Sequence, residues 1–330
     1  MQHETHGISM GRRCALALAL AATTLGTSAW GQNWPSKPVR LVVGYSAGGG
    51  VDAMARMIAP RMSALLGQQV IVDNRTGAAG LIAGDTVARA APDGYTLMLG
   101  DSSLLIAQHL QPRMSFDPIK AFTPVAGVFT LPLVIVANND VPARTPAELV
   151  KLLKDNPGRY SYATSGVGTV HHLGFEMLKG QTRSFVVHIP YRGAAQIVPD
   201  VMSGQVPIGV VSAASAITQA RAGKLRALAV MNPVKLAGAE DIAPLSDALP
   251  GFSAVPRLYV LAPAGTPAGI VERLSDTLRA VMEAPDIVQI AAQQGAVPAY
   301  MSAGPLATDI ARESTEWGKV IREQKITATQ

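Results

Sequence analysis

The stretch that decides the fold is VRLVVGYSAGGGVDAMAR, residues 39–56. Its first five residues, 39–43, form a β-branched run that is typical of a short strand. The glycines then break the strand, and the chain continues from Asp52 to Leu66 with helical spacing. A strand, a glycine-rich loop and a helix form a unit of α/β folds. The same unit returns at 160–179, where the loop reads TSGVGTVHH from Thr164 to His172.

Strands and helices alternate outward from this unit. We expect further strands at 70–74, 95–99, 133–137, 186–189, 208–211, 227–231 and 258–262, and further helices at 81–90, 196–203, 215–222, 267–282 and 305–323. Thr145, Pro146 and Glu148 have the spacing of a capping box and predict one more helix start. This order predicts mostly parallel sheets covered by helices, which is an α/β fold.

The repeated unit and the length of 330 residues indicate two α/β domains. The helices at the C-terminus must dock on one of the two sheets, so we expect a discontinuous first domain of 32–131 and 254–330. Residues 132–253 then form the second domain. Ligands of open α/β sheets lie beyond the carboxyl ends of the strands. Two such ends that face each other predict a ligand cleft between the domains, with a hinge behind it.

The N-terminus is typical of an export signal. Residues 12–13 are two arginines, residues 14–25 are an apolar run, and 29–31 place small residues at the −3 and −1 positions of a cleavage site. We expect residues 1–31 to be removed, Gln32 to start the mature protein, and the periplasm to be its location. The apolar run is shorter than the roughly 20 residues of a membrane-spanning helix. The paired arginines leave both the general and the twin-arginine export routes open.

Composition excludes several classes of protein. Apolar residues make up 48% and charged residues 15%, which fits packed cores and not a disordered chain. Without the first 31 residues the net charge is +4, and it is dispersed. That dispersion argues against nucleic acid as a partner and suits capture of small anions. The one cysteine, Cys14, lies in the expected signal, so the mature chain lacks thiolate metal sites and cysteine nucleophiles.

The loop Gly44–Asp52 can hold an anion. Its glycines let backbone N–H groups approach a ligand closely, and the helix start adds about half a positive charge. A plain tight turn is the equal alternative, in which Asp52 caps the helix or holds the loop. Gly44, Ser46 and Gly48 also match the G-x-S-x-G turn of hydrolases. That turn follows several earlier strands in hydrolases, whereas here it follows the first strand of the mature chain.

The loop Thr164–His172 offers hydroxyls and backbone amides, and we expect it to oppose the first loop. His171 and His172 are adjacent in sequence, so they point to different sides of a helix. A metal-binding pair prefers i, i+4 spacing. One exposed and one packed histidine is therefore the favoured interpretation, with His172 bracing the loop.

Two more strand ends add candidates. Tyr191 follows the strand at 186–189 and is placed to line the cleft, whereas Arg192 either leans toward an anion or lies in a surface turn. Asp101 and Ser102 follow the strand at 95–99. A carboxylate beside an anion site is unfavourable unless it is offset. Asp101 therefore either meets an amino group of the ligand or caps the next helix.

Taken together, these segments resemble the Bug family, the periplasmic solute-binding proteins of tripartite tricarboxylate transporters. The matching stretches span nearly the whole mature chain in the right order: YSAGGGVDAMAR, VIVDNRTGAAGLIAGDTVARAAPDGYTLMLG, YATSGVGTVHHLG, IPYRGAAQIVPDVMSGQV, AGKLRALAV and LAPAGTPAGIVERL. The PDGYTL and APAGTP stretches are specific in combination. The resemblance implies a type II periplasmic-binding-protein fold that closes on its ligand, and a carboxylate bound through backbone amides and bridging water.

The resemblance also implies which positions bind the ligand: Ser46, Ala47, Gly48, Gly49 and Asp52 in the first wall, and Ser165, Gly166, Gly168, Thr169, His172, Tyr191 and Gly193 in the second. To these the residues themselves add Tyr45, Asp101, Ser102 and Thr164. The chain departs from the family pattern at Gly50-Val51, where a hydroxyl residue is frequent, at Tyr45, where Phe is usual, and at Asp101, where small or hydroxyl residues are usual. These departures favour an amino acid, or a carboxylate with a hydrogen-bond donor, over citrate.

The predicted function is therefore capture of a small carboxylate, which is a dicarboxylate, a tricarboxylate, an acidic amino acid or an aromatic carboxylate. We expect no catalysis, no cofactor and no metal. The expected partners are the two membrane subunits of a tripartite tricarboxylate transporter, met by a monomer. Two alternatives stay open: a sensor with the same cleft that signals to a membrane receptor kinase, and a secreted serine hydrolase that uses Ser46.

Overall fold

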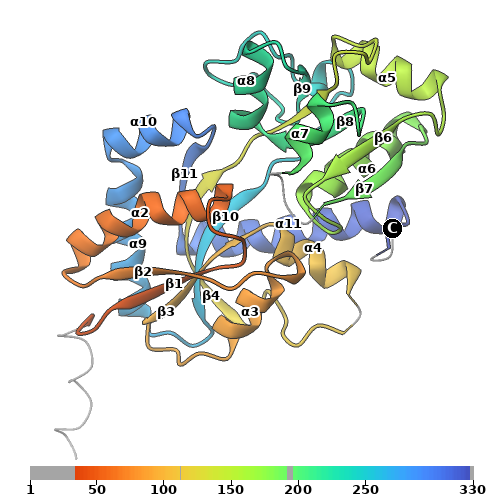
Figure 1. Cartoon of the computed structure of the whole chain (residues 1–330). Coiled ribbons are helices and arrows are strands. Elements are labelled where there is room, and N and C mark those ends of the chain that lie inside the picture. The colour runs from red at the N-terminus through yellow and green to blue at the C-terminus, as the bar shows by residue number, and fades with distance from the viewer. Residues whose placement is uncertain (1–33, 112, 192–195, 328–330) are drawn as a thin grey trace, which may run out of the picture. The chain divides into compact units, whose positions relative to one another are not determined.

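The computed structural model describes residues 34–111, 113–191 and 196–327. The chain divides into two units, Met1–Ser36 and Lys37–Gln330, and the second unit is described here by itself. It holds two β-sheets with helices packed against them (Figure 1). The predicted signal peptide, residues 1–31, lies outside the described residues.

The first sheet, sheet A, has the strand order β11-β4-β10-β3-β1-β2. Its strands are β1 (Val39–Val43), β2 (Val70–Asn74), β3 (Thr96–Asp101), β4 (Phe122–Thr130), β10 (Arg257–Pro263) and β11 (Val297–Ser302). Strand β1 is parallel to β2 and β3, whereas β10 runs antiparallel to both β3 and β4. The helices around it are α2 (Gly50–Leu66), α3 (Leu81–Ala88), α4 (Ser103–Leu110), α9 (Ala268–Met282), α10 (Pro285–Gln293) and α11 (Ala303–Glu323).

The second sheet, sheet B, has the strand order β7-β6-β8-β5-β9. Its strands are β5 (Leu133–Ala137), β6 (Ser161–Thr164), β7 (Val187–Pro190), β8 (Ile208–Ser212) and β9 (Arg226–Val230). Strand β6 is parallel to β7 and β8, and β5 is antiparallel to β8 and β9. Its helices are α5 (Pro146–Asp155), α6 (Val170–Thr182), α7 (Ile197–Met202) and α8 (Ala213–Arg221).

The chain passes between the two sheets at two places that are hydrogen-bonded to each other. Residues 131–132 join β4 to β5, and residues 231–256 join β9 to β10. Leu131 N donates to Pro256 O at 2.9 Å, and Met231 N donates to Leu133 O at 2.8 Å. The two crossings are therefore hydrogen-bonded neighbours.

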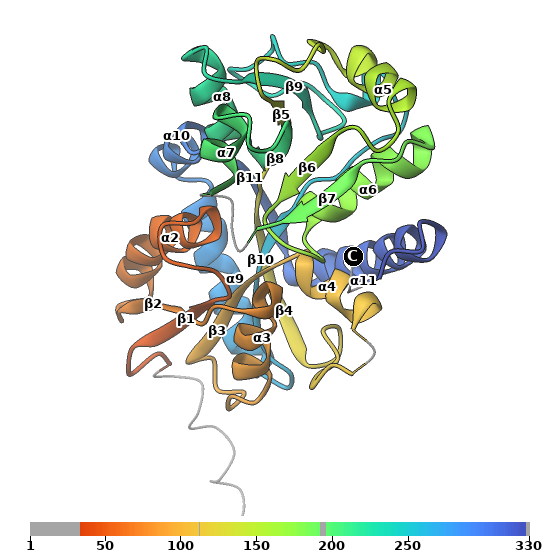
Figure 2. The ribbon, with the colours of Figure 1, turned by 45° about the vertical axis from the view of Figure 1, so that its right-hand side comes forward.

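One hydrophobic core contains residues from sheet B and from the helices α4 and α11. Tyr162 and Phe175, whose rings stack with centroids 3.8 Å apart, share this core with Leu110, Trp317 and Ile321. The views in Figures 1 and 2 show α11 beside α4, and α11 also contacts α6. The long C-terminal helix thus docks on both sheets: its first half covers sheet A, and its second half reaches the core of sheet B.

The predicted alternation of strands and helices is confirmed, with most element ends within two residues of the prediction. The predicted cap at Thr145 is present, since Glu148 N donates to Thr145 Oγ1 at 3.2 Å. The Glu148 carboxylate, however, accepts from Arg144 N at 2.7 Å and not from the cap residue itself. The sequence analysis did not predict β4, α10 and β11, and it gave no bounds for α4, which is the helix expected after Asp101. Pro124 and Gly127 interrupt β4 and Pro298 interrupts β11, so both strands read as loops.

Candidate functional site

The first candidate loop joins β1 to α2, and the buried carboxylate of Asp52 holds it. Asp52 is 2% exposed. It accepts hydrogen bonds from Gly48 N at 2.8 Å, from Arg56 Nε at 2.9 Å and from Asn74 Nδ2 at 2.9 Å. Burial alone would raise the pKa of this carboxyl, but the hydrogen bonds from Arg56, Gly48 and Asn74 outweigh burial and hold the pKa below its usual value. Of the two roles left open by the sequence, Asp52 therefore holds the loop.

The N-terminus of α2 carries no side-chain cap. Its N-cap residue is Gly49, and no side-chain cap bond is present there in the described part of the chain. Ser46, Ala47 and Gly48 are exposed in front of it. Gly48 has a φ of +81°, a backbone conformation that favours glycine. This 17-residue helix therefore presents the positive end of its dipole, and its first amides, beside an exposed loop.

Tyr45 joins this loop to the end of β3. Its hydroxyl donates to Asp101 Oδ2 at 2.8 Å. Asp101 also accepts from Ser103 N at 3.2 Å, in the first turn of α4, so the capping role is the one that its contacts support. Burial raises the pKa of Asp101 to about 6, although the hydrogen bonds from Tyr45 and Ser103 oppose that rise. A contact between Asp101 and a ligand stays a prediction.

Asp101 and Ser102 also connect the loop to the crossing between the sheets. Tyr259 Oη, on β10, donates to the Asp101 carbonyl oxygen at 2.6 Å. The Ser102 hydroxyl oxygen accepts from Arg257 N at 3.0 Å, and Ser102 N donates to Arg257 O at 3.3 Å. Both side chains are buried, so their contacts fasten the end of β3 to β10.

The second candidate loop joins β6 to α6 and is held by hydroxyl groups. Thr169 is the N-cap of α6: its Oγ1 accepts from His172 N at 3.4 Å and donates to Gly166 O at 2.8 Å. Thr164 Oγ1 accepts from Gly166 N at 3.4 Å. Gly166 and Gly168 have φ values of +131° and +80°. Ser165 is half-buried, and its side chain forms no hydrogen bond to another described residue.

His172 lies under this loop. Its side chain is fully buried, and its Nδ1 accepts from Gly168 N at 3.3 Å. Burial and the charge of Lys179 lower the pKa of His172 to about 4. His171 is half-buried, so the predicted packed histidine is present at 172 but the predicted exposed one is not found at 171. No cluster of three metal-ligating side chains is present among the described residues.

Tyr191 extends the second loop and is bonded to α7. Its amide donates to Thr164 O at 2.9 Å, and its hydroxyl donates to Asp200 Oδ2 at 2.5 Å. That bond to Asp200 raises the pKa of Tyr191 to about 12. Arg192 and Gly193, which the sequence also proposed, lie outside the described residues.

Several residues that shape the two loops were missed by the sequence analysis. Arg56 and Asn74 complete the Asp52 network, and His188 and Glu176 surround His172. The i, i+4 spacing of Asp52 and Arg56 was a usable signal. Glu176 has the same i, i+4 spacing to His172, whereas no local pattern indicates Asn74 and His188, because they come from other segments of the chain.

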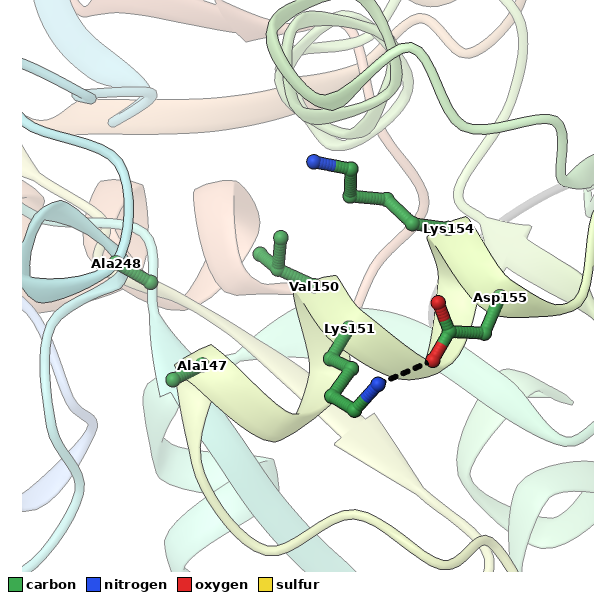
Figure 3. Close-up of a pocket in the computed structure, with 6 residues that line it drawn as sticks. All are labelled: Ala147, Val150, Lys151, Lys154, Asp155 and Ala248. Atoms are coloured by element: carbon green, nitrogen blue, oxygen red, sulfur yellow. Dashed lines mark hydrogen bonds and ion pairs between the residues drawn. The ribbon is translucent and has the colours of Figure 1, made fainter.

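A surface hollow of about 320 Å³ lies elsewhere, along the outer side of α5. Figure 3 shows its lining: Ala147, Val150, Lys151, Lys154, Asp155 and Ala248. Lys151 Nζ and Asp155 Oδ2 are paired across one turn at 2.6 Å. None of the predicted site residues lines it, so this hollow is separate from the candidate site. No helix in the described part of the chain is long and apolar enough to cross a membrane.

Two glycine-rich loops at strand ends, on two sheets joined by a double crossing, define the class of the periplasmic binding proteins. Residues 54–326 match the model of the tripartite tricarboxylate transporter family receptor, so the chain belongs to this family, which includes the Bug proteins. The family consists of periplasmic solute-binding receptors. The resemblance predicted from the sequence is therefore confirmed, together with the fold class.

The relatives cover nearly the full chain. A UPF0065 protein of Pseudomonas sp. strain P51, in the tcbD-tcbE intergenic region, is 36% identical over 98% of this chain and 97% of its own. The structure of a Rhodopseudomonas palustris protein with adipate is 30% identical, with a TM-score of 0.83, and covers 89% of this chain and 99% of that one. MatC of the same organism, with bound malate, is 27% identical, with a TM-score of 0.78, over 87% and 100%.

Proposed function

We propose that this receptor captures a small carboxylate between the loops 44–52 and 164–172, with C4–C6 dicarboxylates as the first candidates. The observation that carries the proposal is the uncapped N-terminus of α2. Its N-cap residue Gly49 has no side-chain cap among the described residues, and the Asp52 carboxylate is already engaged by Gly48 N, Arg56 and Asn74. An anion at this position is stabilised by the helix dipole without any lysine or arginine.

The ligand class follows from two further points. Solved relatives hold adipate and malate, each a dicarboxylate. In this chain the second loop is built from hydroxyls and amides, and Thr169 and Thr164 are committed to holding its backbone. We therefore expect direct ligand contacts from Ser46, Ala47, Gly49, Ser165 and Gly166, while Asp52, Thr164, Thr169 and His172 support the loops.

The rest of the proposal concerns how the receptor works. The first domain consists of residues 32–131 and 254–330, and the second of residues 132–253. The two domains close about residues 131–132 and 254–256, which lie in the two crossings. The mature chain is released into the periplasm after cleavage at residue 31. It then delivers its ligand, as a monomer, to the two membrane subunits of a tripartite tricarboxylate transporter. A non-catalytic role is part of the same proposal.

Calorimetry on the mature chain, refolded to remove bound ligand, tests this function. The panel holds adipate, malate, citrate, glutamate, benzoate and the neutral diamide of adipate. We expect at least one carboxylate to bind, the diamide to fail, and a saturating ligand at 100 times its Kd to stabilise the fold by about 2.7 kcal/mol. Equal binding of adipate and its diamide, or no binding across the panel, would contradict the proposal.

A further inference from the structure

His172 is the most unusual polar group near the candidate site. Its imidazole is fully buried at the first turn of α6. Nδ1 accepts from the backbone N–H of Gly168 at 3.3 Å. A ring nitrogen that accepts carries no proton, so the ring is neutral and its proton resides on Nε2. The hydrogen bond thus fixes one tautomer of one buried ring.

The surroundings of the ring favour this neutral state. The ring stacks on His188 of β7, with centroids 4.1 Å apart and planes inclined by 15°. Two cationic imidazoles at that separation would repel each other strongly. His172 Nε2 has no hydrogen-bond partner among the described residues, and Glu176 Oε1 lies 3.9 Å away from it. That oxygen already accepts from Tyr162 Oη and Lys179 Nζ, both at 2.5 Å.

The charged groups near the ring therefore neutralise each other and need no charge on His172. Glu176 and Lys179 form an ion pair on α6, and Tyr162 of β6 donates to the same carboxylate. On the other side His188 Nε2 is 2.7 Å from Thr164 Oγ1. Protonating His172 would break its bond to Gly168 and place a second positive charge near Lys179 in a buried position, which is consistent with its low pKa of about 4.

The stacked pair reaches the loop on both sides. His188 contacts Thr164, whose hydroxyl bonds Gly166, while His172 bonds Gly168 directly. Both glycines have positive φ values and lack side chains to fix their conformation. Gly168 also lies against α4, because a Cβ placed on it would come within 3.3 Å of Leu110 Cδ1. The conformation of the loop therefore depends on its contacts with His172, Thr164 and Leu110.

We propose that His172 is a positioning residue: its neutral ring, stacked on His188, fixes the Gly168 amide and so keeps the Gly166–Thr169 loop in its ligand-binding form. This inference rests on the proposed function for its effect on binding. The ring itself is enclosed and does not touch the ligand. Position 172 therefore requires a buried hydrogen-bond acceptor that can reach Gly168 N, and it does not require a positive charge.

Three variants test the proposal. His172→Asn retains a side-chain oxygen close to the position of Nδ1, whereas His172→Leu keeps bulk and removes the acceptor. His171→Leu is the matched control, one residue away on the half-buried side of the same helical turn. The first readout is amide hydrogen exchange at Gly168, which needs no ligand. We expect protection to fall in His172→Leu, and to be retained in His172→Asn and in His171→Leu.

The second readout is the imidazole ¹⁵N spectrum of the wild type, where we expect the Nε2–H tautomer of His172 from pH 8 to pH 5. The third is the Kd for the tightest carboxylate of the calorimetric panel. We expect it to rise roughly tenfold or more in His172→Leu and to recover to within about threefold of wild type in His172→Asn.

The outcomes separate the two proposals. An Nδ1–H tautomer, equal Gly168 exchange in the Leu and Asn variants, or an unchanged Kd in His172→Leu would each overturn the positioning role. If no carboxylate binds the wild type, the proposed function fails, and the exchange and tautomer results still decide whether His172 fixes the loop. To separate a local effect from a loss of global stability, His172→Leu and His172→Asn are compared at temperatures at which both variants are folded.

Discussion

The loop before α2 is held by a charged side chain, whereas the loop before α6 is held by neutral ones. Asp52 binds Gly48 in the first loop, and its partner Arg56 reaches the solvent with 53% of its side chain exposed. Thr169 and His172 hold the second loop, and both are buried. Both loops follow a strand, contain glycines with positive φ and open a helix, so the same backbone shape is reached by different chemistry.

The difference assigns different tasks to the two loops. Helix α2 has no side-chain cap, so its first amides are available to an anion. Helix α6 is capped by Thr169, which engages the amide of His172. We therefore expect most of the charge recognition at the first loop, and recognition of shape and hydrogen bonding at the second.

The largest expected effect comes from Asp52→Ala. The substitution removes the acceptor shared by Gly48, Arg56 and Asn74. Removing one partner of a buried network costs about 3 kcal/mol of unfolding free energy, and we expect the affinity for the carboxylate to fall roughly tenfold or more as the loop loses its shape. Urea unfolding and calorimetry measure the two effects.

Asp85→Ala is the matched control for Asp52. Asp85 and Arg89 form the same i, i+4 ion pair on α3, but with side chains 35% and 69% exposed. Exposed pairs contribute little, so we expect a loss of about 0.5 kcal/mol or less and unchanged binding. A loss in Asp52→Ala no larger than in Asp85→Ala would contradict the role given to Asp52.

The second effect is a pH dependence that comes from Asp101. Burial raises its pKa from 3.8 to about 6 in the folded state. The protonated form is thus favoured by folding, and its stabilisation is complete below pH 3.8 and is lost as the pH rises through 6. Two pKa units correspond to about 3 kcal/mol. We expect wild-type stability, measured relative to Asp101→Asn, to fall by up to this amount between pH 4 and pH 7.

Asp52 provides the opposite slope within the same experiment. Its folded-state pKa lies below 3.8, so its contribution is present above that pH and is lost as the pH falls below it. We therefore expect the difference between wild type and Asp52→Asn to shrink only below about pH 4. Parallel pH profiles for the Asp52 and Asp101 variants would show that the two carboxyl groups do not differ as their environments indicate.

The third effect compares two helix caps. Thr169 caps α6 at the candidate site and Thr145 caps α5, each accepting from the amide three residues ahead. We expect Thr169→Val and Thr145→Val each to lower the unfolding free energy by about 1 kcal/mol. Only Thr169→Val is expected to weaken carboxylate binding, since Thr169 also holds Gly166. If Thr169→Val and Thr145→Val bind the carboxylate with equal affinity, the second loop does not contribute to ligand binding.

The sequence predicted the loops well and their supports poorly, for a physical reason. Glycines, strand runs and caps are local signals, so both loops and the Thr145 cap were readable from neighbouring residues. The contact of His172 with His188 joins α6 to β7, and that of Asp52 with Asn74 joins α2 to β2. Such contacts depend on how strands pair, which periodicity does not encode.

The unpredicted elements show a second limit. Strand β4 contains a proline and a glycine, yet it pairs with β10 and β11 through irregular registers that accommodate both residues. Both sheets are mixed, so the prediction of mostly parallel sheets holds only for β1–β3 in sheet A and for β6–β8 in sheet B, whereas β10 runs antiparallel to β3 and β5 runs antiparallel to β8. The docking of α11 on both sheets likewise depends on tertiary packing that its own amphipathic pattern does not specify.

The smallest effect on stability is expected from Ser46→Ala. Ser46 is exposed, and its carbonyl oxygen, which accepts from Gly49 N at 3.1 Å, is unaffected by the substitution. We expect the unfolding free energy to change by less than about 0.5 kcal/mol. If the hydroxyl donates to the ligand, the Kd rises by roughly 3- to 10-fold, which is the worth of one hydrogen bond. The same variant tests the hydrolase alternative, because an esterase activity of the wild type that disappears in Ser46→Ala would favour an enzyme.

An unchanged Kd in Ser46→Ala would mean that only backbone amides of the first loop recognise the ligand. The first loop would then bind the ligand without any side-chain hydroxyl, in contrast to the second loop, which is built from hydroxyl groups.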